Sequence, residues 1–476
     1  MPMVATKAIL VTSLSGVALL GGCASVQPRE SFPAVERTVA ERTSYCVHWN
    51  DGSDADKAVA AQVDALLAKP LDADAAVQIA LLNNRNLQAV YETLGVAQAE
   101  LVAAGLLRNP VFDGSVRFLE AGGSPTLDFG IAFDFLDVFF IGARKNLAEA
   151  QLEAVKANVT SAVLGMAGDV KVAFYAVQAA EQTVELRRQV EQATAASYDL
   201  AKRLREAGNN TQLDLAYERA LYEEARLALA AAETDATVAH ENLTRLMGLW
   251  GKQNQWKVAG RLPDLPADEV ASADLERRAI ENSLELQASR AQLAVVLREL
   301  GIALPLGYLS ELEVGVSSER DDGKWELGPS VAFPIPIFSQ GQPIVARVQA
   351  QLRQAQQRYY ATAVEVRSNV RSAYTRVRSL RQQAEHYRTV ILPLRQTIVE
   401  QTQLQYNAMQ IGAFQLLQAK RDQIEAGRTY LSVLKDYWTA KTELELGLRG
   451  RSMQPSSVAS TSSEAAPAGS GTAGGH

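Results

Sequence analysis

Residues 341–410 read GQPIVARVQAQLRQAQQRYYATAVEVRSNVRSAYTRVRSLRQQAEHYRTVILPLRQTIVEQTQLQYNAMQ. Apolar residues recur along this stretch at steps of three or four, from Val345 and Val348 to Leu394 and Ile398, which is the spacing of a coiled-coil seam. At roughly 1.5 Å per residue, such a helix is on the order of 100 Å long, and no compact core could cover it. Because the apolar steps continue beyond Pro393, we expect a kink there and not a helix end.

The chain contains the same succession of segments twice, at an offset of about 200 residues. In each copy a helix comes first, two short strands follow, and then come a very long helix and a returning helix. We place the two repeats at 73–250 and 273–450, joined by a linker at 251–272. The matching segments are 80–84 (ALLNN) and 279–283 (AIENS), 130–135 and 328–333, 170–174 and 370–374, and 206–208 and 410–412.

The hydrophobic period changes from helical to two after the first helix of each repeat. In the first repeat that helix is expected over 75–107, ending before Asn109-Pro110, because proline does not continue a helix. Four strands are too few to close a barrel, so several chains would have to share one, and three chains would supply about twelve strands. The alternation predicts strands at about 111–119, 126–136, 309–318 and 325–335.

Each very long helix leads into a turn that contains glycine, 207–211 (AGNNT) in the first repeat and 411–414 (IGAF) in the second. Glycine and asparagine tolerate the left-handed conformation that ends many helices, and Thr211 suits the N-cap of the next helix. The chain then returns as a second helix that ends near Gly248 or Gly447. The sequence therefore predicts an α+β fold, mainly α, with two long antiparallel coiled-coil helical hairpins and four β-strands per chain.

The first residues have the pattern of a secretory leader. An apolar stretch from Ala8 to Leu20 is too short to span a bilayer, and it ends in Leu20-Gly21-Gly22-Cys23, which resembles a bacterial lipobox. We therefore expect a lipoprotein signal peptide at 1–22 and lipidation of Cys23, the alternative being an ordinary leader that contains a cysteine. Residues 23–72 are expected to form an N-terminal periplasmic segment, and 451–476, rich in Ser, Ala and Gly, a disordered tail.

Composition argues against several functions. The formal net charge is −7 and basic residues form no block of the kind that binds nucleic acid. Cys46 has no expected intramolecular disulfide partner, and Cys46-Val47-His48 supplies too few ligands for a metal site. The sequence has no phosphate-binding loop, zinc-protease helix or nucleophile elbow, and the acidic pair Glu223-Glu224 is interpreted as a solvated helix face. We expect no catalytic residue, no cofactor, no metal and no enzymatic activity.

The duplicated unit behind a lipobox resembles the TolC-type outer membrane efflux proteins, or outer membrane factors, in their lipoprotein subtype. The resemblance implies a homotrimeric exit duct with a shared twelve-stranded transmembrane β-barrel, anchored to outer membrane lipid and extending far into the periplasm. Its expected partners are a periplasmic adaptor (membrane fusion) protein and an inner membrane efflux pump, and its cargo small toxic compounds or heavy-metal ions. The segments that carry the resemblance are 80–84, 109–110, 207–214 (AGNNTQLD), 333–338 (FPIPIF) and 411–418 (IGAFQLLQ).

The same resemblance assigns roles to the two glycine turns. It places the turns at the periplasmic tip against the adaptor, which here means Gly208, Asn209, Asn210, Thr211, Gly412, Ala413 and Phe414. It also implies an acidic ring at the periplasmic aperture, where this chain departs from the family by having Gln418, Arg421 and Asp422 after the second turn and Asp214 after the first. The alternatives are a type I protein secretion duct and a structural coiled-coil lipoprotein without a pore.

Overall fold

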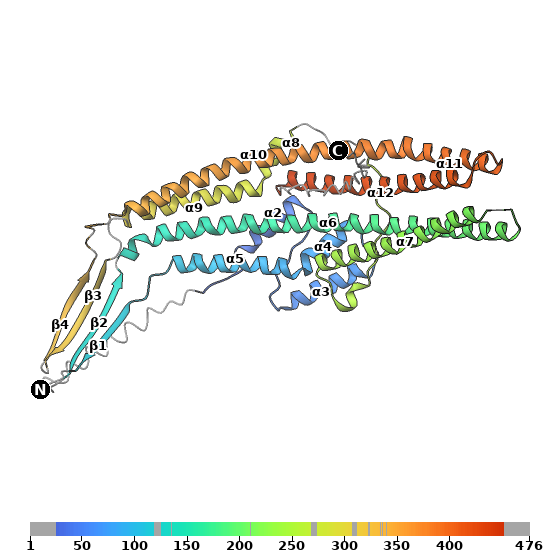
Figure 1. Cartoon of the computed structure of the whole chain (residues 1–476). Helices are drawn as coiled ribbons and strands as arrows, with labels where there is room; N and C mark the ends of the chain where they lie inside the picture. The colour runs from blue at the N-terminus through green and yellow to red at the C-terminus, as the bar shows by residue number, and fades with distance from the viewer. Residues whose placement is uncertain are drawn as a thin grey trace, which may run out of the picture.

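The computed structural model describes residues 25–451 except for 119–124, 135, 210, 268–273, 307–311, 322–323, 334, 336 and 339. The expected leader, the lipidation site Cys23 and the tail beyond Arg451 therefore lie outside the described residues. The chain is long and narrow, with a small sheet at one end and two helical hairpins at the other (Figure 1). Within the described part of the chain all four strands belong to that sheet, so the expected mainly helical α+β class is confirmed.

The two repeats contain the same elements in the same order. The first consists of α4 (Ala73–Asn83), α5 (Arg85–Ala104), β1 (Val111–Arg117), β2 (Thr126–Asp134), α6 (Leu136–Glu206) and α7 (Gln212–Met247). The second consists of α8 (Leu275–Asn282), α9 (Leu284–Leu306), β3 (Glu313–Asp321), β4 (Lys324–Ala332), α10 (Gln342–His386), the π turn η2 (Tyr387–Ile391), α11 (Leu392–Asn407) and α12 (Ala413–Arg449).

The first helix of the first repeat is broken where a single helix over 75–107 was expected. Asn84 has extended backbone and its side chain accepts a hydrogen bond from the Leu87 amide, which begins α5 as a separate helix. Asn83 and Asn84 also donate side-chain hydrogen bonds to carbonyls at the end of α7. Periodicity could not reveal this break, because the apolar spacing continues through it. In the second repeat Ser283 plays the part of Asn84 and accepts from the Leu286 amide.

The four strands form one antiparallel sheet in the order β1-β2-β3-β4. β3 runs from Glu313 to Asp321 and pairs with β4 up to Asp321 and Lys324, so the strand predicted at 309–318 continues three residues beyond its expected end. Residues 309–311 lie outside the described residues. Residues 317–321 are all polar, so the apolar alternation used for the prediction stops before the backbone hydrogen bonds do. β1 and β2 lie within one or two residues of the predicted bounds.

The long helices are as expected, α6 alone having 71 residues. Residues 342–407 form an uninterrupted helical path in which the π turn η2 lies directly before Pro393. Proline has no N–H and its ring crowds the carbonyl four residues earlier, and a widened turn relieves that conflict. Pro393 therefore modifies the helix without ending it, as its position within the apolar pattern predicted.

The N-terminal segment and the expected linker pack onto the first repeat. Helices α2 (Phe32–Arg42) and α3 (Asp54–Leu67) lie beside α4 and α6, and the Phe32 ring contacts the buried Tyr91 edge-on. Residues 251–267 include the short 3₁₀ helix η1 (Gly251–Asn254), and Trp256 is 4% exposed. The Leu71 amide donates to the Lys257 carbonyl, so residues 251–267 of the expected linker at 251–272 pack against the first repeat.

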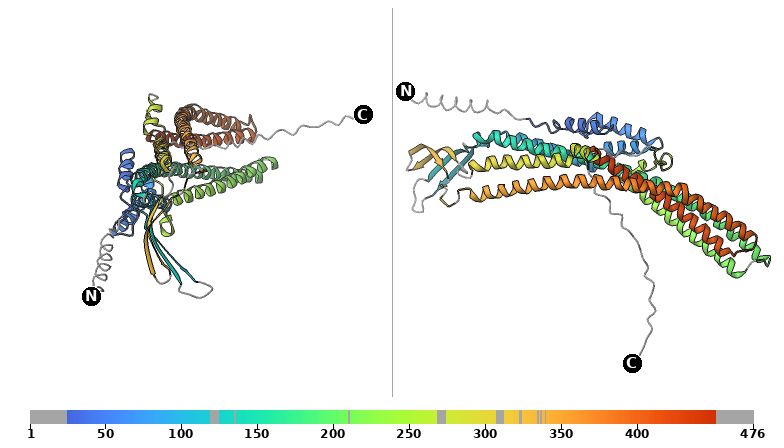
Figure 2. Two further views of the ribbon diagram at one scale, coloured as in Figure 1. Left: turned by 90° about the vertical axis from the view of Figure 1, so that its left-hand side faces the viewer. Right: turned by 90° about the horizontal axis from the view of Figure 1, so that it is seen from above.

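The helices form a curved sheet of rods with two free edges. In the half next to the strands the order of contacting helices is α5, α6, α9 and α10, and in the far half it is α7, α6, α12 and α11 (Figure 2). α6 and α12 are thus interior in the far half, whereas α5 and α7 form one free edge and α10 and α11 the other.

Candidate functional site

The sheet has one apolar and one polar face. Successive residues of a strand point to opposite faces, and the register aligns the apolar ones across all four strands. The Phe112 and Phe129 rings lie 6.1 Å apart, and those of Phe129 and Trp325 6.2 Å. The opposite face carries charged residues, including an Arg117–Asp128 ion pair. The apolar face consists of Phe112, Val116, Leu127, Phe129, Ile131, Phe133, Val314, Val316, Trp325, Leu327, Pro329 and Val331, interrupted by Gly114, Ser318 and Arg320.

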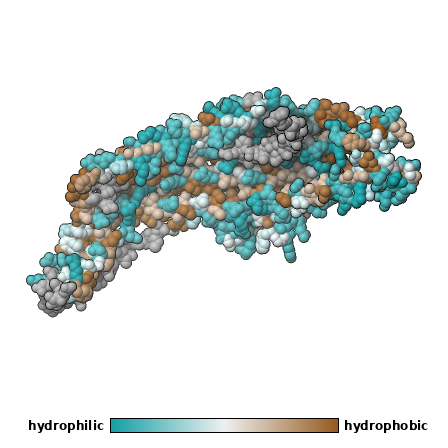
Figure 3. All heavy atoms as spheres, in the orientation of Figure 1, coloured by the Kyte–Doolittle hydropathy of each residue, from teal (hydrophilic) through white to brown (hydrophobic). Residues whose placement is uncertain are grey.

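Nothing among the described residues covers the apolar face. Leu327 is 78% exposed and Ile131 55%, far above what an isolated soluble sheet would leave open. β1 and β4 each pair on one side only within the described sheet, which leaves two rows of backbone groups to be satisfied. Figure 3 shows brown and tan, apolar residues along and next to the strands and again at the far end of the helices, while teal predominates on the shaft between them. The exposed apolar face is therefore suited to contact with an apolar medium. Each of the two edge strands is suited to pairing with a strand of another sheet.

A buried carboxylate fixes the junction between sheet and helices. Asp137, 6% exposed, lies 2.9 Å from the Arg144 guanidinium and 3.5 Å from that of Arg108. Arg144 also donates to the Leu106 carbonyl at the end of the α5 segment. The start of α6 is thereby tied to the chain that enters β1. No pattern in the sequence distinguished this cluster from other charged residues.

None of the described helices combines enough length and apolar character to span a membrane. Among the described residues no group of three or more His, Cys, Asp or Glu could hold a metal ion. Cys46 is an exposed free thiol.

At the α6–α7 tip, the expected left-handed helix end and the expected threonine N-cap are both present. Gly208 has φ +79°, the left-handed conformation that ends α6, and the Asn209 amide donates to the Leu204 carbonyl over 2.8 Å. Thr211 caps α7: its hydroxyl oxygen accepts from the Asp214 amide at 3.1 Å, and the Asp214 carboxylate accepts from the Thr211 amide at 3.3 Å. Asp214, an expected aperture residue, is thus engaged in a capping box at the tip. Asn210 lies outside the described residues.

At the α11–α12 tip the prediction that Gly412 ends the helix was wrong. The left-handed residue is Met409, with φ +56°, and Gly412 is the N-cap of α12 with φ −82° and no side chain to cap it. The hydrogen bond from the Gln410 amide to the Gln405 carbonyl matches the one from Asn209 to Leu204. Met409 therefore corresponds to Gly208 and Gly412 to Thr211. Pairing the two turns by their glycines therefore places them three residues out of register.

This register changes the comparison of the aperture candidates. The residue that corresponds to Asp214 is Gln415, three residues after the N-cap, and not Gln418. Apolar groups missed from the sequence also lie at the tips: Met409 is 94% exposed, and the Tyr217 ring lies 6.1 Å from the Phe414 ring. That contact brings the two hairpins together at their ends. The side chain of Ala413 lies outside the described residues.

The remaining aperture candidates form two polar contacts. Asp422 accepts hydrogen bonds from Arg395 of α11 and from Gln418, each at 2.9 Å, so these groups link the two helices of one hairpin. Arg421 instead donates to Glu224 of α7 at 2.7 Å, which joins the two hairpins. Glu224, interpreted from the sequence as part of a solvated face, is solvent-exposed and also a partner in this link. Arg395 and Glu224 had no sequence signal, because their partners are 27 and 197 residues away.

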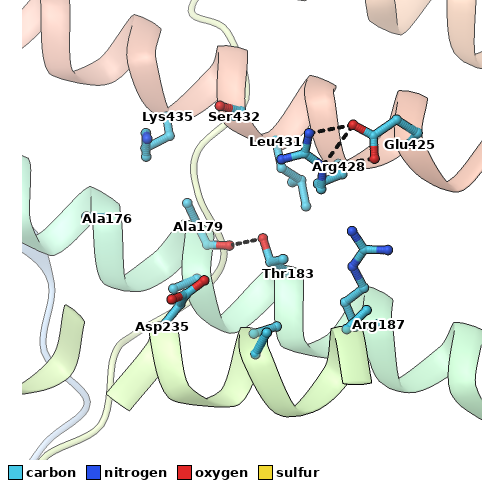
Figure 4. Close-up of a pocket in the computed structure, with 14 residues that line it drawn as sticks. Ala176, Ala179, Thr183, Arg187, Asp235, Glu425, Arg428, Leu431, Ser432 and Lys435 are labelled. Atoms are coloured by element: carbon cyan, nitrogen blue, oxygen red, sulfur yellow. Dashed lines mark hydrogen bonds and ion pairs between the residues drawn. The ribbon is translucent and has the colours of Figure 1, made fainter. Parts of the chain in front are cut away.

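A cleft of about 700 Å³ lies between the hairpins, bounded by α6, α7 and α12. Its floor is alanine, and Arg187, Asp235 and Lys435 stand around it (Figure 4). Glu425 at its rim accepts a hydrogen bond from Arg428, which lowers the pKa of the Glu425 carboxyl. The cleft separates the two hairpins above their contacts at the tips.

Known proteins share this architecture. Residues 76–249 match the model of the outer membrane efflux protein family. The chain is 25% identical over 387 residues to the cobalt-zinc-cadmium resistance protein CzcC of Cupriavidus metallidurans, covering 79% of this chain and 90% of that protein. It is 25% identical over 363 residues to the antibiotic efflux pump outer membrane protein ArpC of Pseudomonas putida, covering 71% and 73%. The Campylobacter jejuni CmeC outer membrane channel has the same fold, with a TM-score of 0.67 at 16% identity over 79% of this chain and 85% of that one.

An open amphipathic sheet continued by two long helical hairpins defines a channel-forming protein of the outer membrane. The match to the family model and the relatives identify the particular class. The chain is an outer membrane efflux channel, as the resemblance of its sequence predicted, and its first repeat matches the model of the outer membrane efflux protein family.

Proposed function

We propose that three copies of this chain form the outer membrane duct of a tripartite efflux system, with one continuous twelve-stranded barrel. The observation that carries the proposal is the four-stranded sheet with one exposed apolar face and two single-paired edges. Lipid tolerates neither an unpaired strand edge nor a polar outer face, and closure of three such sheets meets both requirements. The polar face, with Arg117, Asp128 and Glu319, would then line the water-filled interior.

In this proposal the helices extend the barrel as a tube into the periplasm, and the duct performs no chemistry. Its partners are a periplasmic adaptor and an inner membrane pump, which supplies the energy. The cargo is heavy-metal ions or small toxic compounds, in line with the names of the two relatives, one a metal resistance protein and one an antibiotic efflux protein. Acyl chains on Cys23 anchor the mature chain to outer membrane lipid, more than one being needed for stable attachment.

The test of the duct is single-channel conductance of the purified lipidated protein in a planar bilayer, with its mass measured in detergent. A conducting particle of three chains is the expected result. A monomer that gives no conductance would contradict the proposal and favour a coiled-coil lipoprotein that spans the periplasm without a pore.

The hairpin tips are proposed to dock the adaptor. Gly208, Asn209, Asn210, Thr211, Gly412, Ala413 and Phe414 belong to the two turns, and Met409 joins them as the most exposed apolar side chain there. With Cys46→Ser as background, Asn209→Cys and Ala413→Cys should each cross-link to the adaptor in whole cells. Cross-linking to no adaptor of the host would contradict docking at the tips.

The contacts between hairpins near the tip are proposed to hold the aperture closed. Arg421 and Glu224 join the hairpins at 2.7 Å, whereas Asp422 and Gln418 act within one hairpin. Arg421→Ala should therefore raise conductance, and Gln418→Ala, the matched control on the same helix turn, should change it little. Equal conductance of Arg421→Ala and the parent channel would remove the gating role.

A further inference from the structure

The free edges of the helical array carry opposite charge. Along the α10–α11 edge, residues 342–407 contain ten arginines and three glutamates, a net charge of +7. Along the other edge, α5 and α7 together contain nine acidic and four basic residues, a net charge of −5. The interior helix α6 has nine of each, and α12 six basic and five acidic. Excess charge is therefore concentrated at the two edges, with opposite signs.

Many of these charged edge residues form no ion pair with a described residue of their own chain. Arg371, Arg376 and Arg395 have ion-pair partners in their own chain. Among the residues that the structure describes, no ion pair involves the six exposed arginines Arg347, Arg353, Arg358, Arg367, Arg378 and Arg388. On the α5 edge, Glu100 is likewise exposed with no ion pair to any described residue.

Both edges also expose apolar side chains. On α5, Val96 is 60% exposed, and the exposed residues near it are the small Ala89, Ala99 and Ala103 together with the acidic Glu92 and Glu100. On α10, Tyr360 is 63% exposed and Val364 66%. Helices meet closely where one side presents small residues and the other large ones, because the large side chains then fill the gaps between the small ones.

These patches lie at the same height along the molecule. One cleft is lined by residues 98–101 of α5 and 291–298 of α9, and another by residues 289–299 of α9 and 351–358 of α10. Residues near 100 on α5 are therefore level with residues near 355 on α10. One helical turn further from the sheet, Val96 comes level with Tyr360, and Glu100 lies within an arginine's length of the height of Arg353.

We infer that the α10 edge of one copy docks against the α5 edge of the next, with Tyr360 and Val364 packed on Val96 and Arg353 facing Glu100. The inference rests on the proposed trimer and specifies its seam. Because the edges differ in sign, copies join head to tail, and contact between two like edges is opposed by charge repulsion. A head-to-tail contact closes into a ring when its rotation allows, which is what a shared barrel needs.

Cysteine pairing tests the seam directly. In a Cys46→Ser background, the double variant Val96→Cys/Tyr360→Cys should give covalently linked trimers on mild oxidation. The yield should be at least about tenfold above that of either single variant, because a disulfide needs Cα atoms within about 7 Å. The matched control Val96→Cys/Leu297→Cys pairs the same position with an exposed residue of the interior helix α9, Leu297 being 50% exposed, and should remain unlinked.

The outcomes separate the seam from the duct. If the unmodified protein is a conducting trimer and the double variant does not cross-link, the seam is wrong and the duct stands. Linkage within Val96→Cys or Tyr360→Cys alone would show that like edges meet, which also overturns the inference. An unmodified protein that is monomeric and does not conduct removes both.

Charge reversal gives a second readout that does not depend on cysteine geometry. Arg353→Glu and Glu100→Arg should each make the trimer dissociate faster on dilution in detergent, and the combination should restore the parent rate. Arg290→Glu on α9 makes the same charge change away from the seam and should leave the rate unchanged. Single variants that behave like the parent, or a combination that is not restored, would contradict the charge pairing.

Discussion

The α6–α7 and α11–α12 hairpins have the same topology and are stabilised differently at corresponding positions. At the first tip a glycine adopts the left-handed conformation and a Thr211–Asp214 capping box starts the return helix. At the second tip Met409 takes the left-handed conformation and Gly412 caps α12 without a side chain. The second hairpin also contains the π turn η2. A duplicated unit can therefore keep its shape while one copy loses local stabilisation at its tip, and the α11–α12 tip should be the easier one to move.

The largest difference is expected at the roots of the hairpins, where Gly248 and Gly450 end α7 and α12 in left-handed conformations. A Cβ on Gly450 would overlap the Asn282 carbonyl oxygen and an Arg42 nitrogen, whereas on Gly248 it would lie 2.8 Å from the Asn83 carbonyl oxygen. Gly450→Ala should destabilise by more than about 3 kcal/mol, since strain and overlap add. The check is the midpoint of thermal unfolding by circular dichroism. Gly248→Ala is the comparison, and an equal or larger loss there would contradict the ranking.

A buried ion pair is present in one hairpin and missing at the matching position of the other. Arg376 of α10 donates to Glu443 of α12 over 2.7 Å, and Glu443 is 5% exposed, whereas the first repeat has Ala176 in place of Arg376. Arg376→Ala leaves the carboxylate without this partner and should cost about 3 kcal/mol. Arg376→Ala/Glu443→Leu should recover much of that loss. The stability of both variants is measured by thermal unfolding. If Arg376→Ala unfolds at the same temperature as the parent, the ion pair does not stabilise the protein.

The capping box should make the first tip more protected than the second. Thr211→Ala removes the acceptor for the Asp214 amide and should cost about 1 kcal/mol, felt mainly in the first turn of α7. Amide hydrogen exchange of residues 212–215 is the measurement. Thr211→Ser keeps the hydroxyl and should exchange like the parent; exchange unchanged in Thr211→Ala would mean that the box has no local effect.

Met409→Gly should increase stability, whereas the preceding substitutions decrease it. A left-handed conformation costs a non-glycine residue about 1 kcal/mol, and glycine at this position removes that cost. Because glycine also makes the unfolded chain more flexible, the expected net gain in stability is about 0.5 kcal/mol. The readout is slower hydrogen exchange around residue 409. Met409→Ala keeps the strain and should show no such gain, and a gain in both variants would point to loss of the exposed side chain.

The smallest effect is expected from Gly412→Ser, which would build into the second tip the capping box that the first one has. Gly412 has φ −82°, which any residue can adopt, and Gln415 stands at the position where a capping box has Glu or Gln. A gain of a few tenths of a kcal/mol follows from replacing glycine at an N-cap. Slower exchange at residues 413–416 would confirm it, and faster exchange would show that the turn cannot accept the side chain.

The duplicated order of elements, the long helices and the four strands could all be predicted from the sequence alone. Each of these depends on periodicities of 2 or about 3.5 residues, which are local properties that neighbouring residues reveal. The continuation of the long helix through Pro393 could also be predicted, because the apolar steps continue on both sides of the proline.

The helix breaks, the register of the two turns and the pairing of distant side chains required the three-dimensional structure. The break at Asn84 depends on carbonyls of α7 more than 160 residues away, and the Arg421–Glu224 link spans 197. The correspondence of Gly208 with Met409 depends on backbone dihedral angles, which the presence of a glycine in each turn concealed. Hydrogen bonds and ion pairs between distant segments form only when packing brings both partners together, so one sequence shows each partner but not the pair.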